Sequence, residues 1–428
     1  MSGHRHADEP RVTTLGNGLR VVTRTLPHLR TAAIGLWVGA GSRHEPLERQ
    51  GLAHFLEHMA FKGTATRSAR QIAEAIEDVG GDINASTGQE NTAYHARVMG
   101  ADVPLALDVL TDILRRARFA PSDIALEKGV VLQEIAAALD DPDDRTTDLL
   151  QEAAFPDQTL GRPILGTPAS VHAVTAADLR AFVEAQQVGP NIVLSAAGEV
   201  DHDALVAEAE RLLGDLPALA APAMTAARFV GARRSERGSG DQAHLTLALP
   251  AASLVDADVY VHAILASALG GGLSSRLFQT IREERGLAYD VSAFHWAFAD
   301  SGLLGFDAAT DEDQAETLAH HLLAEIARAA DELTDTEIAR AVAGARTGLA
   351  MSLESPMASA ERAARQLLQF GRIVPVEESL EGIARVEARH CRDALRAMLA
   401  DGRRAVAVVG PSGRAADILA GDAARLAA

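Results

Sequence analysis

The sequence has very little cysteine and no long apolar run. Its 428 residues include a single cysteine, Cys391, which excludes a disulfide framework and suits a reducing compartment. Cys391 recurs at helical spacing with Leu395 and Met398, so we expect a buried core thiol. No apolar run reaches the roughly 18 residues that a membrane-spanning helix requires. Residues 1–10 are polar and lack the apolar core of a signal peptide, so we expect a cytoplasmic protein.

Basic residues are also scarce relative to acidic ones. The chain has 40 Lys and Arg residues against 59 Asp and Glu residues, a formal net charge of −19. Nucleic acids and anionic membranes attract basic surfaces, so we expect neither as a partner. The acidic excess is compatible with basic substrates, although solubility alone is the simpler explanation of it. The 47% of hydrophobic residues is ample for more than one buried core.

Strand-like and helix-like patterns occur in both halves of the chain without strict alternation. A second series of elements follows the first at an offset of about 210 residues, which indicates a duplication. We expect strands over 12–25, 32–38, 82–98 and 191–198 in the first half, and the duplication is read from two correspondences: 291–306 repeats 82–98, and 404–410 repeats 191–198. We therefore predict an α+β fold of two homologous lobes, each a largely antiparallel β-sheet packed with helices.

Two domains follow from this duplication. We expect an N-terminal lobe over 1–214 and a C-terminal lobe over 231–428. A stretch rich in Ala, Pro and Leu begins at Asp215 and predicts a linker over 215–230.

The most informative stretch is His54-Phe55-Leu56-Glu57-His58. It contains no proline and suits a helix, on which His54 and His58 lie one turn apart with Glu57 beside them. Two neutral imidazoles can hold one zinc ion, and the carboxylate can act on a water at that ion. H-x-x-E-H is a known zinc-peptidase signature, but the same pattern also arises by chance. A catalytic zinc normally needs a third protein ligand, which must come from elsewhere in the chain.

Glu134 is the candidate for this third ligand. It lies among apolar neighbours on a helix expected to run from Ser122 to about Leu139, where a carboxylate needs a partner and a metal would serve. Glu127, seven residues earlier, falls on the same helix face and could orient a ligand. From the residues alone, the alternative is that both glutamates lie on an ordinary solvated helix face.

These motifs resemble the pitrilysin/insulinase family of zinc metallopeptidases, and most closely its half-length processing-peptidase branch. The family pattern is H-x-x-E-H followed, at a characteristic spacing, by a glutamate ligand, and Glu134 stands at that spacing from His58. Glu127 falls on the family's second carboxylate. The flanking residues match as well, at Gly41-Ser-Arg43, Gly51-Leu-Ala53 and Phe61-Lys-Gly-Thr64.

The resemblance covers nearly the whole chain and implies a zinc endopeptidase. It assigns one Zn²⁺ per chain to His54, His58 and Glu134. It makes Glu57 the general base and Glu127 a residue that supports the ligands. The implied substrates are extended, unfolded peptides or presequences, held in a chamber between lobes.

Two segments are implied to bind substrate. Asn84-Ala85-Ser86-Thr87 resembles the family's edge strand, on which a peptide lies as an added β-strand. An ordinary sheet strand is the alternative. Asp144 and Asp148 match acidic positions that favour basic residues near the cut. Pro142 leaves the directions of these side chains open, and a solvated acidic loop is the alternative.

Arg282 and Tyr289 match a pair that the family's second lobe contributes to the active site. A guanidinium and a phenol can hold a peptide carbonyl and its developing oxyanion. Without the resemblance, we would expect a surface arginine and a half-buried tyrosine. In full-length relatives the pair comes from the half that lacks zinc. We therefore expect a homodimer in which Arg282 and Tyr289 act in trans on the zinc of the other chain.

Two non-enzymatic functions remain as alternatives. Relatives of this fold serve as catalytically silent scaffold subunits, and the edge strand alone could make a peptide-binding module. The residues named for catalysis are all present in this chain, which favours the enzyme: His54, Glu57, His58, Glu127, Glu134, Arg282 and Tyr289.

Overall fold

Each half of the chain builds one β-sheet, as the duplication predicts. The computed structural model describes residues 9–238, 240–410 and 413–421. These residues divide into two compact units. Unit 1 takes in the chain up to Ile135, Ile164–Met224 and Ala350–Val374; unit 2 takes in Ala136–Pro163, Thr225–Leu349 and the chain from Pro375 onward.

The sheet of unit 1 has six strands in the order β1-β2-β6-β3-β5-β4. The strands are β1 (Arg11–Thr14), β2 (Arg20–Thr25), β3 (Thr31–Val38), β4 (Asp82–Thr87), β5 (Thr92–Met99) and β6 (Ile192–Gly198). Only β2 and β6 pair in parallel among these strands; the other neighbours are antiparallel. Gly18, with φ of +89°, allows the tight β1–β2 hairpin. β4 lies at one edge of the sheet.

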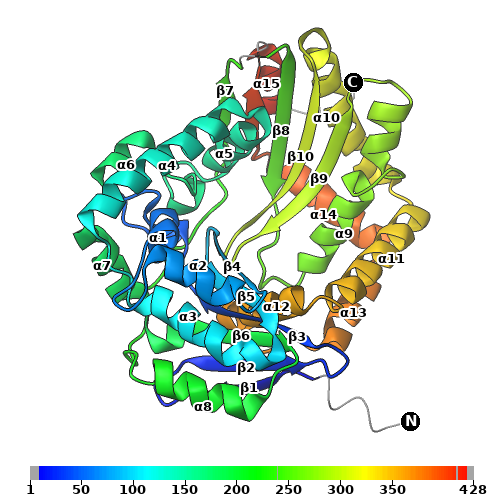
Figure 1. Ribbon diagram of the computed structural model, residues 1–428. Coiled ribbons are helices and arrows are strands. Elements are labelled where there is room, and N and C mark those ends of the chain that lie inside the picture. Colours follow the sequence, from blue (N-terminus) through cyan, green and yellow to red (C-terminus); the bar gives the residue numbers. More distant parts are fainter. Residues whose placement is uncertain (1–8, 239, 411–412, 422–428) are drawn as a thin grey trace, which may run out of the picture. The chain divides into compact units, whose positions relative to one another are not determined.

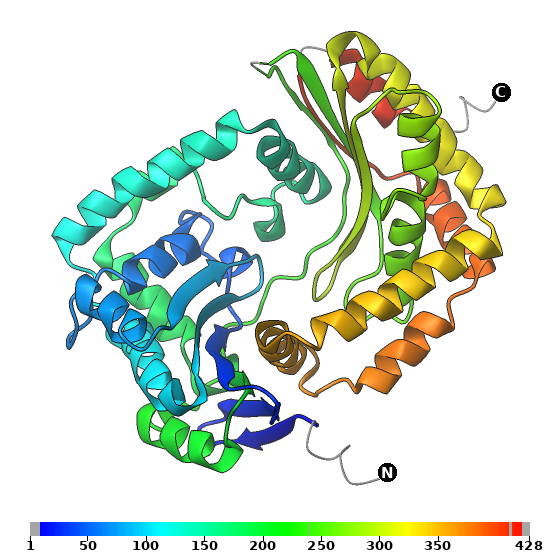
Figure 2. The same ribbon diagram turned by 45° about the vertical axis from the view of Figure 1, so that its right-hand side comes forward.

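Helices cover both faces of this sheet (Figures 1 and 2). One face packs on α1 (Leu52–Ala60), α2 (Ala69–Glu77), α3 (Val103–Arg115), α7 (Ala176–Gln186) and α8 (His202–Leu213). The opposite face packs on α12 (Pro356–Phe370). Alternate residues of β3 therefore enter two cores: Ile34 and Leu36 face the first, and Trp37 faces α12. This double burial explains why β3 reads as a continuous apolar run.

The sheet of unit 2 has five strands in the order β7-β11-β8-β10-β9. The strands are β7 (Arg233–Glu236), β8 (Gln242–Pro250), β9 (Asp290–Ala297), β10 (Gly302–Asp311) and β11 (Ala405–Val409). One face packs on α9 (Val259–Gly270), α10 (Ala315–Glu332), α14 (Ala388–Asp401) and α15 (Gly413–Ala420), with Cys391 buried among them as expected. The other face packs on α5 (Pro142–Ala154).

The two sheets repeat one topology. β3 begins at Thr31 and its counterpart β8 at Gln242, while β6 begins at Ile192 and its counterpart β11 at Ala405, so both pairs keep nearly the same offset along the chain. Each sheet has its parallel pair at the same place, β2 with β6 and β7 with β11. The α+β fold of two homologous lobes is therefore confirmed, with sheets that are mostly antiparallel.

Two helices are exchanged between the repeats. α5 follows the first-half strands in sequence but packs on the sheet of unit 2, while α12 comes from the second half and packs on the sheet of unit 1. The compact units therefore differ from the continuous lobes 1–214 and 231–428 in these segments. An apolar helix face predicts that a helix is covered, but not which sheet covers it.

Several further helices complete the described structure. They are α4 (Pro121–Asp140), α6 (Pro168–Ala173), α11 (Asp335–Ser352), α13 (Val376–Ala384) and short turns that include η1 (Ser42–His44) and the π-helical η5 (Phe278–Glu283). α4 begins at Pro121, ahead of the expected start at Ser122, because proline suits the first helical position.

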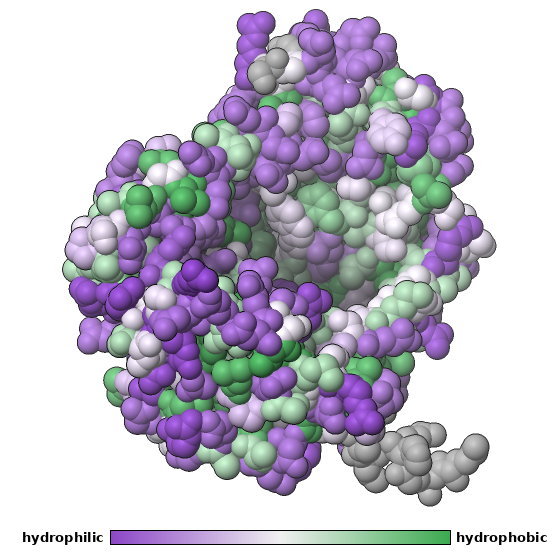
Figure 3. Space-filling view, viewed as in Figure 1, coloured by the Kyte–Doolittle hydropathy of each residue, from purple (hydrophilic) through white to green (hydrophobic). Residues whose placement is uncertain are grey.

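Polar residues predominate on the face of the molecule that Figure 3 shows, in keeping with the high charge of the chain. Within the described residues, no helix has the length and apolar character to cross a membrane. Residues 1–8, on which part of the signal-peptide expectation rests, lie outside the described residues.

Candidate active site

Helix α1 presents the H-x-x-E-H residues at the rim of the unit 1 core. Leu52, Phe55 and Met59 are buried in that core, which leaves His54, Glu57 and His58 on the partly exposed face. This division follows from the helical period, because residues three and four apart share a face.

An upstream carboxylate fixes the start of α1. The two side-chain oxygens of Glu45 accept hydrogen bonds from Gly51 N at 2.8 Å and Ala53 N at 2.7 Å. A negative charge at a helix N-terminus satisfies its free amides and complements the helix dipole. Gly51 has φ of +80°, a conformation that favours glycine. Sequence reasoning missed Glu45, although an acidic residue shortly before a helix was an available signal.

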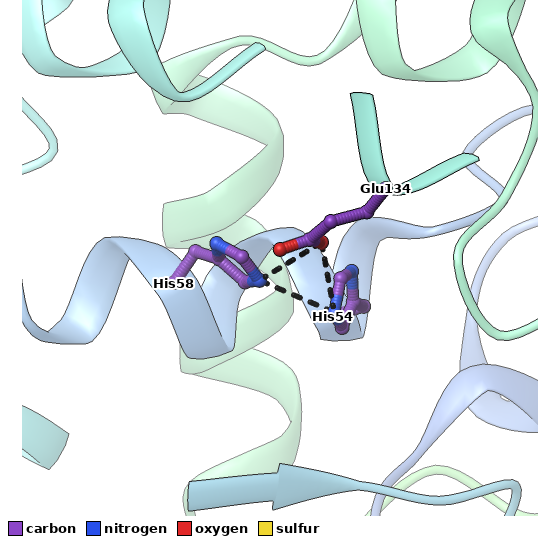
Figure 4. Close-up of side chains that lie close together, drawn as sticks. All are labelled: His54, His58 and Glu134. Carbon is purple, nitrogen blue, oxygen red and sulfur yellow. Dashed lines mark hydrogen bonds and ion pairs between the residues drawn. The ribbon is translucent and has the colours of Figure 1, made fainter. Parts of the chain in front are cut away.

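Glu134 reaches the two histidines from α4 (Figure 4). His54 Nε2 and His58 Nε2 lie 3.2 Å apart, and Glu134 Oε2 lies 3.4 Å from His58 Nε2 and 3.8 Å from His54 Nε2. Three corners of a tetrahedron with zinc–ligand bonds of about 2.0–2.2 Å would be about 3.4 Å apart. The structure thus brings together the three residues that the sequence proposed as ligands.

The donor atoms of His54, His58 and Glu134 suit a bound cation. Glu134 Oε2 is buried and has no hydrogen-bond partner among the described residues. Burial, together with the nearby His58, lowers the pKa of His54 to about 4, so its imidazole is neutral at neutral pH. Two imidazole nitrogens and one carboxylate oxygen form a donor set that zinc prefers. A zinc ion therefore fits the residues present.

A buried carboxylate orients His58. Glu127 Oε1 lies 2.7 Å from His58 Nδ1, and the Glu127 side chain is only 3% exposed. With Nδ1–H donating to Glu127, His58 Nε2 keeps its lone pair toward Glu134. Lys62 Nζ lies 2.7 Å from the other oxygen, Glu127 Oε2, and balances its charge. Lys62 lies within the matched flank Phe61–Thr64, but its contact with Glu127 was not predicted.

Glu57 contacts the end of the edge strand. Thr87 Oγ1 donates a hydrogen bond of 2.5 Å to Glu57 Oε2. Burial raises the pKa of Glu57, and the hydrogen bond from Thr87 partly opposes that rise. A carboxylate with a raised pKa is a better proton acceptor in catalysis near neutral pH than an ordinary one.

The predicted substrate strand is the outermost strand of its sheet. Asn84, Ala85, Ser86 and Thr87 all lie on β4, which among the described strands pairs with β5 alone. Asn84 and Ser86 are exposed, Ala85 is buried, and Asn84 Oδ1 accepts a hydrogen bond of 2.8 Å from Ala85 N. β4 also runs beside α1. The outer edge of β4, which pairs with no other described strand, thus lies next to the helix that carries His54 and His58.

Arg282 and Tyr289 lie together in unit 2. The Arg282 guanidinium stacks over the Tyr289 ring, 4.6 Å from its centroid, and over the Phe278 ring at the same distance. Tyr289 is 81% exposed. The half-buried tyrosine expected from the residues alone is therefore wrong, because the ring rests on a guanidinium at the surface and not in the core.

The acidic pair Asp144 and Asp148 lies on α5. Pro142 occupies the first turn of α5, and Asp141 caps it, so the proline starts a new helix and does not distort one. Asp144 is exposed and Asp148 is partly buried. Burial raises the pKa of Asp148 to about 6; Arg145 opposes this rise, and Asp144 and Glu152 add to it. A cation near Asp148 would relieve this unfavourable charge.

Comparisons with known proteins agree with this arrangement. The family described as "Insulinase (Peptidase family M16)" matches residues 20–168, and that described as "Peptidase M16 inactive domain" matches residues 173–345. A Streptomyces coelicolor protein described as an uncharacterized zinc protease is 40% identical over 422 residues, covering 96% of this chain and 92% of that protein.

Solved structures share the fold at lower identity. A protease from Helicobacter pylori has a TM-score of 0.86 at 19% identity, covering 94% of this chain and all of the other. A chain of complex III from Candida albicans has a TM-score of 0.83 at 22% identity, covering 96% of this chain and 99% of that chain. At these low identities, the two structures show a shared fold and nothing more.

Proposed function

The chain belongs to the insulinase family of peptidases, M16, and is a zinc protease; from this we propose that it is an endopeptidase acting on extended, unfolded peptides or presequences. The observation that carries this proposal is the convergence of His54, His58 and Glu134 near the edge strand β4, where Glu134 Oε2 finds no hydrogen-bond partner in the described part of the chain. A metal site next to a free strand edge suits hydrolysis of a peptide held in extended form.

Different residues of the chain hold the metal and transfer the proton during hydrolysis. His54, His58 and Glu134 would hold one zinc ion per chain, and Glu127 orients His58 for this. Zinc, when bound, lowers the pKa of a coordinated water and polarises the peptide carbonyl. Glu57 accepts a proton from the attacking water and returns it to the leaving amine.

Substrate binds along β4 in this proposal. Backbone groups of residues 84–87 pair with the peptide as an added strand, so affinity depends little on the peptide's sequence. Support comes from the position of β4 at the sheet edge and from the hydrogen bond between Thr87 and Glu57, which ties the strand to the proton acceptor.

Arg282 and Tyr289 stabilise the developing oxyanion, and they do so across a homodimer. A guanidinium and a phenol donate to a carbonyl oxygen as negative charge grows on it. The high exposure of Tyr289 supports a role outside its own core, and the stacking on Arg282 supports joint action of the pair.

The acidic pair Asp144 and Asp148 supports a preference for peptides with basic residues near the cut. Asp148 carries a carboxylate that burial makes costly to ionise, and a bound arginine or lysine would offset that cost. Asp144 is exposed on the same helix and adds to the negative charge.

Mass spectrometry of a mixed peptide library tests the proposed function. We expect the wild-type protein to produce internal cuts that disappear with a chelator and return with zinc. Glu57→Gln should produce none. Stoichiometric zinc without any cleavage would favour a peptide-binding or scaffold role instead.

A further inference from the structure

The hydrogen bond between Thr87 and Glu57 joins two elements that the sequence keeps 30 residues apart. Thr87 is the last residue of β4, and Glu57 lies in the middle of α1. The Oγ1–Oε2 distance of 2.5 Å is in the short range typical of a hydroxyl donating to a carboxylate. The Thr87 hydroxyl engages Glu57 Oε2, and the Thr87 backbone also hydrogen-bonds the Glu57 carboxyl group.

The backbone fixes where Thr87 lies. Directly after it, the chain makes a tight turn over 88–91, closed by a hydrogen bond of 2.8 Å from Gly88 N to Asn91 O. Ser42 N and Arg43 N donate to the carbonyl oxygens of this turn, at 3.1 and 3.0 Å. A Cβ at Gly41 would lie 2.2 Å from Gly88 O, so this close approach requires glycine.

A buried ion pair reinforces the same contact. Arg43 Nη1 lies 2.6 Å from Glu90 Oε1, and the two side chains are 0% and 9% exposed. The turn over 88–91 is therefore held to the segment 41–43 by backbone hydrogen bonds and by charge.

The same segment also fixes where Glu57 lies. Two residues beyond Arg43, Glu45 caps the first amides of α1. One continuous stretch, 41–45, thus holds the end of β4 on one side and the start of α1 on the other. The approach of Thr87 to Glu57 follows from this backbone clamp and not from a chance pairing of side chains.

We propose that Thr87 is a positioning residue for the proton-accepting carboxylate: its hydroxyl holds Glu57 Oε2 so that Oε1 stays turned to the water. The proposal rests on the proposed function, in which Glu57 accepts a proton and β4 holds the peptide. It gives the Thr87 side chain a task separate from backbone pairing with substrate. In this proposal, β4 both holds the peptide and aligns Glu57.

A matched pair of variants tests this assignment. Thr87→Val keeps the side-chain shape and removes the hydroxyl, whereas Thr87→Ser keeps the hydroxyl. We expect Thr87→Val to lower kcat about 10- to 100-fold, the effect of losing a hydrogen bond to a charged group, with KM within about twofold. Thr87→Ser should retain most of the wild-type kcat. Bound zinc should be stoichiometric in both variants.

A binding measurement separates positioning from substrate contact. In the Glu57→Gln background, which does not turn over, Thr87→Val should leave the affinity for a fluorescent peptide unchanged. The proposal is overturned if Thr87→Val matches wild-type kcat, if its defect appears in KM and peptide affinity, or if Thr87→Ser is equally impaired. Failure of the wild-type protein to cleave peptides would instead reject the proposed function.

Discussion

His58 Nδ1 and Glu127 Oε1 lie 2.7 Å apart, and this hydrogen bond determines which nitrogen of His58 faces Glu134. The same carboxylate contacts Lys62 through its second oxygen and is almost fully buried. A histidine ligand fixed in this way loses little freedom when a metal binds. The proposed metal site is therefore preorganised by Glu127 and Lys62, which are not among its proposed ligands.

Glu127→Gln should weaken zinc binding. The substitution keeps the shape of the side chain but removes the charge that His58 and Lys62 share. We expect the zinc dissociation constant to rise about 10- to 100-fold, as is typical when a partner of a metal ligand is lost. Competition with a chromophoric chelator measures it, and Asp140→Asn on the exposed end of α4 is the control. Equal affinity in Glu127→Gln and wild type would contradict this role.

Glu57→Gln should separate metal binding from hydrolysis. The variant keeps His54, His58 and Glu134, so zinc content should stay at one per chain. Loss of the proton acceptor should lower kcat by a factor on the order of 10² to 10⁴. Metal analysis and peptide cleavage on the same preparation measure both quantities. Cleavage at the wild-type rate would assign the proton transfer to another group.

Mixing two inactive chains tests action across a dimer. His58→Ala removes a metal ligand and Arg282→Ala removes the oxyanion partner, so neither homodimer should cleave peptides. A mixed dimer keeps one complete site if Arg282 and Tyr289 act in trans. We expect recovery of at most about a quarter of wild-type activity when equal amounts of the two chains exchange at random. No recovery after demonstrated subunit exchange argues for action in cis.

Asp148→Asn should stabilise the protein at neutral pH. Burial raises the pKa of Asp148 to about 6 from 3.8, so the native state binds its proton more tightly than the unfolded state does. Native stability therefore falls as pH rises from about 4 through about 6. Because the side chain is partly exposed to solvent, we expect the variant to gain only about 1 kcal/mol at pH 7.

Urea unfolding at two pH values measures this effect. The stabilisation of Asp148→Asn should be present near pH 7 and absent near pH 4, where the native aspartate is protonated. Equal stability of variant and wild type at both values would show that Asp148 is well solvated.

Asp148→Asn should also reduce the preference for arginine-containing peptides over their alanine counterparts. If Asp148 and Asp144 attract basic side chains, Asp148→Asn should reduce kcat/KM for an arginine-containing peptide and leave its alanine counterpart nearly unchanged. A double substitution with Asp144→Asn should reduce the preference further. If both variants still prefer the arginine-containing peptide as strongly as wild type does, Asp144 and Asp148 are ordinary solvated surface residues.

The sequence predicts those features that local patterns determine. The helix that carries His54 and His58 follows from its period, and the duplication follows from the recurring order of strands. Glu134 needed the ligand spacing of a known family, because a carboxylate on a helix has many uses. Its approach to both histidines depends on how α4 crosses α1, which no local pattern specifies.

Contacts between distant elements were beyond the reach of sequence patterns. The exchange of α5 and α12 depends on which sheet each apolar helix face covers. The pairing of Thr87 with Glu57 depends on the segment 41–45, which contacts both the turn after β4 and the start of α1, two elements far apart in the sequence. The burial of Tyr289 was misjudged because aromatic residues are usually buried, whereas this ring is exposed and stacks on the partly exposed Arg282.

Zinc K-edge X-ray absorption of the purified, zinc-loaded protein tests the central claim most directly. The account predicts two imidazole nitrogens and carboxylate oxygen at about 2.0–2.2 Å, with no sulfur, and loss of stoichiometric zinc in Glu134→Ala. A sulfur ligand, a third imidazole, or undiminished zinc binding in Glu134→Ala would contradict it.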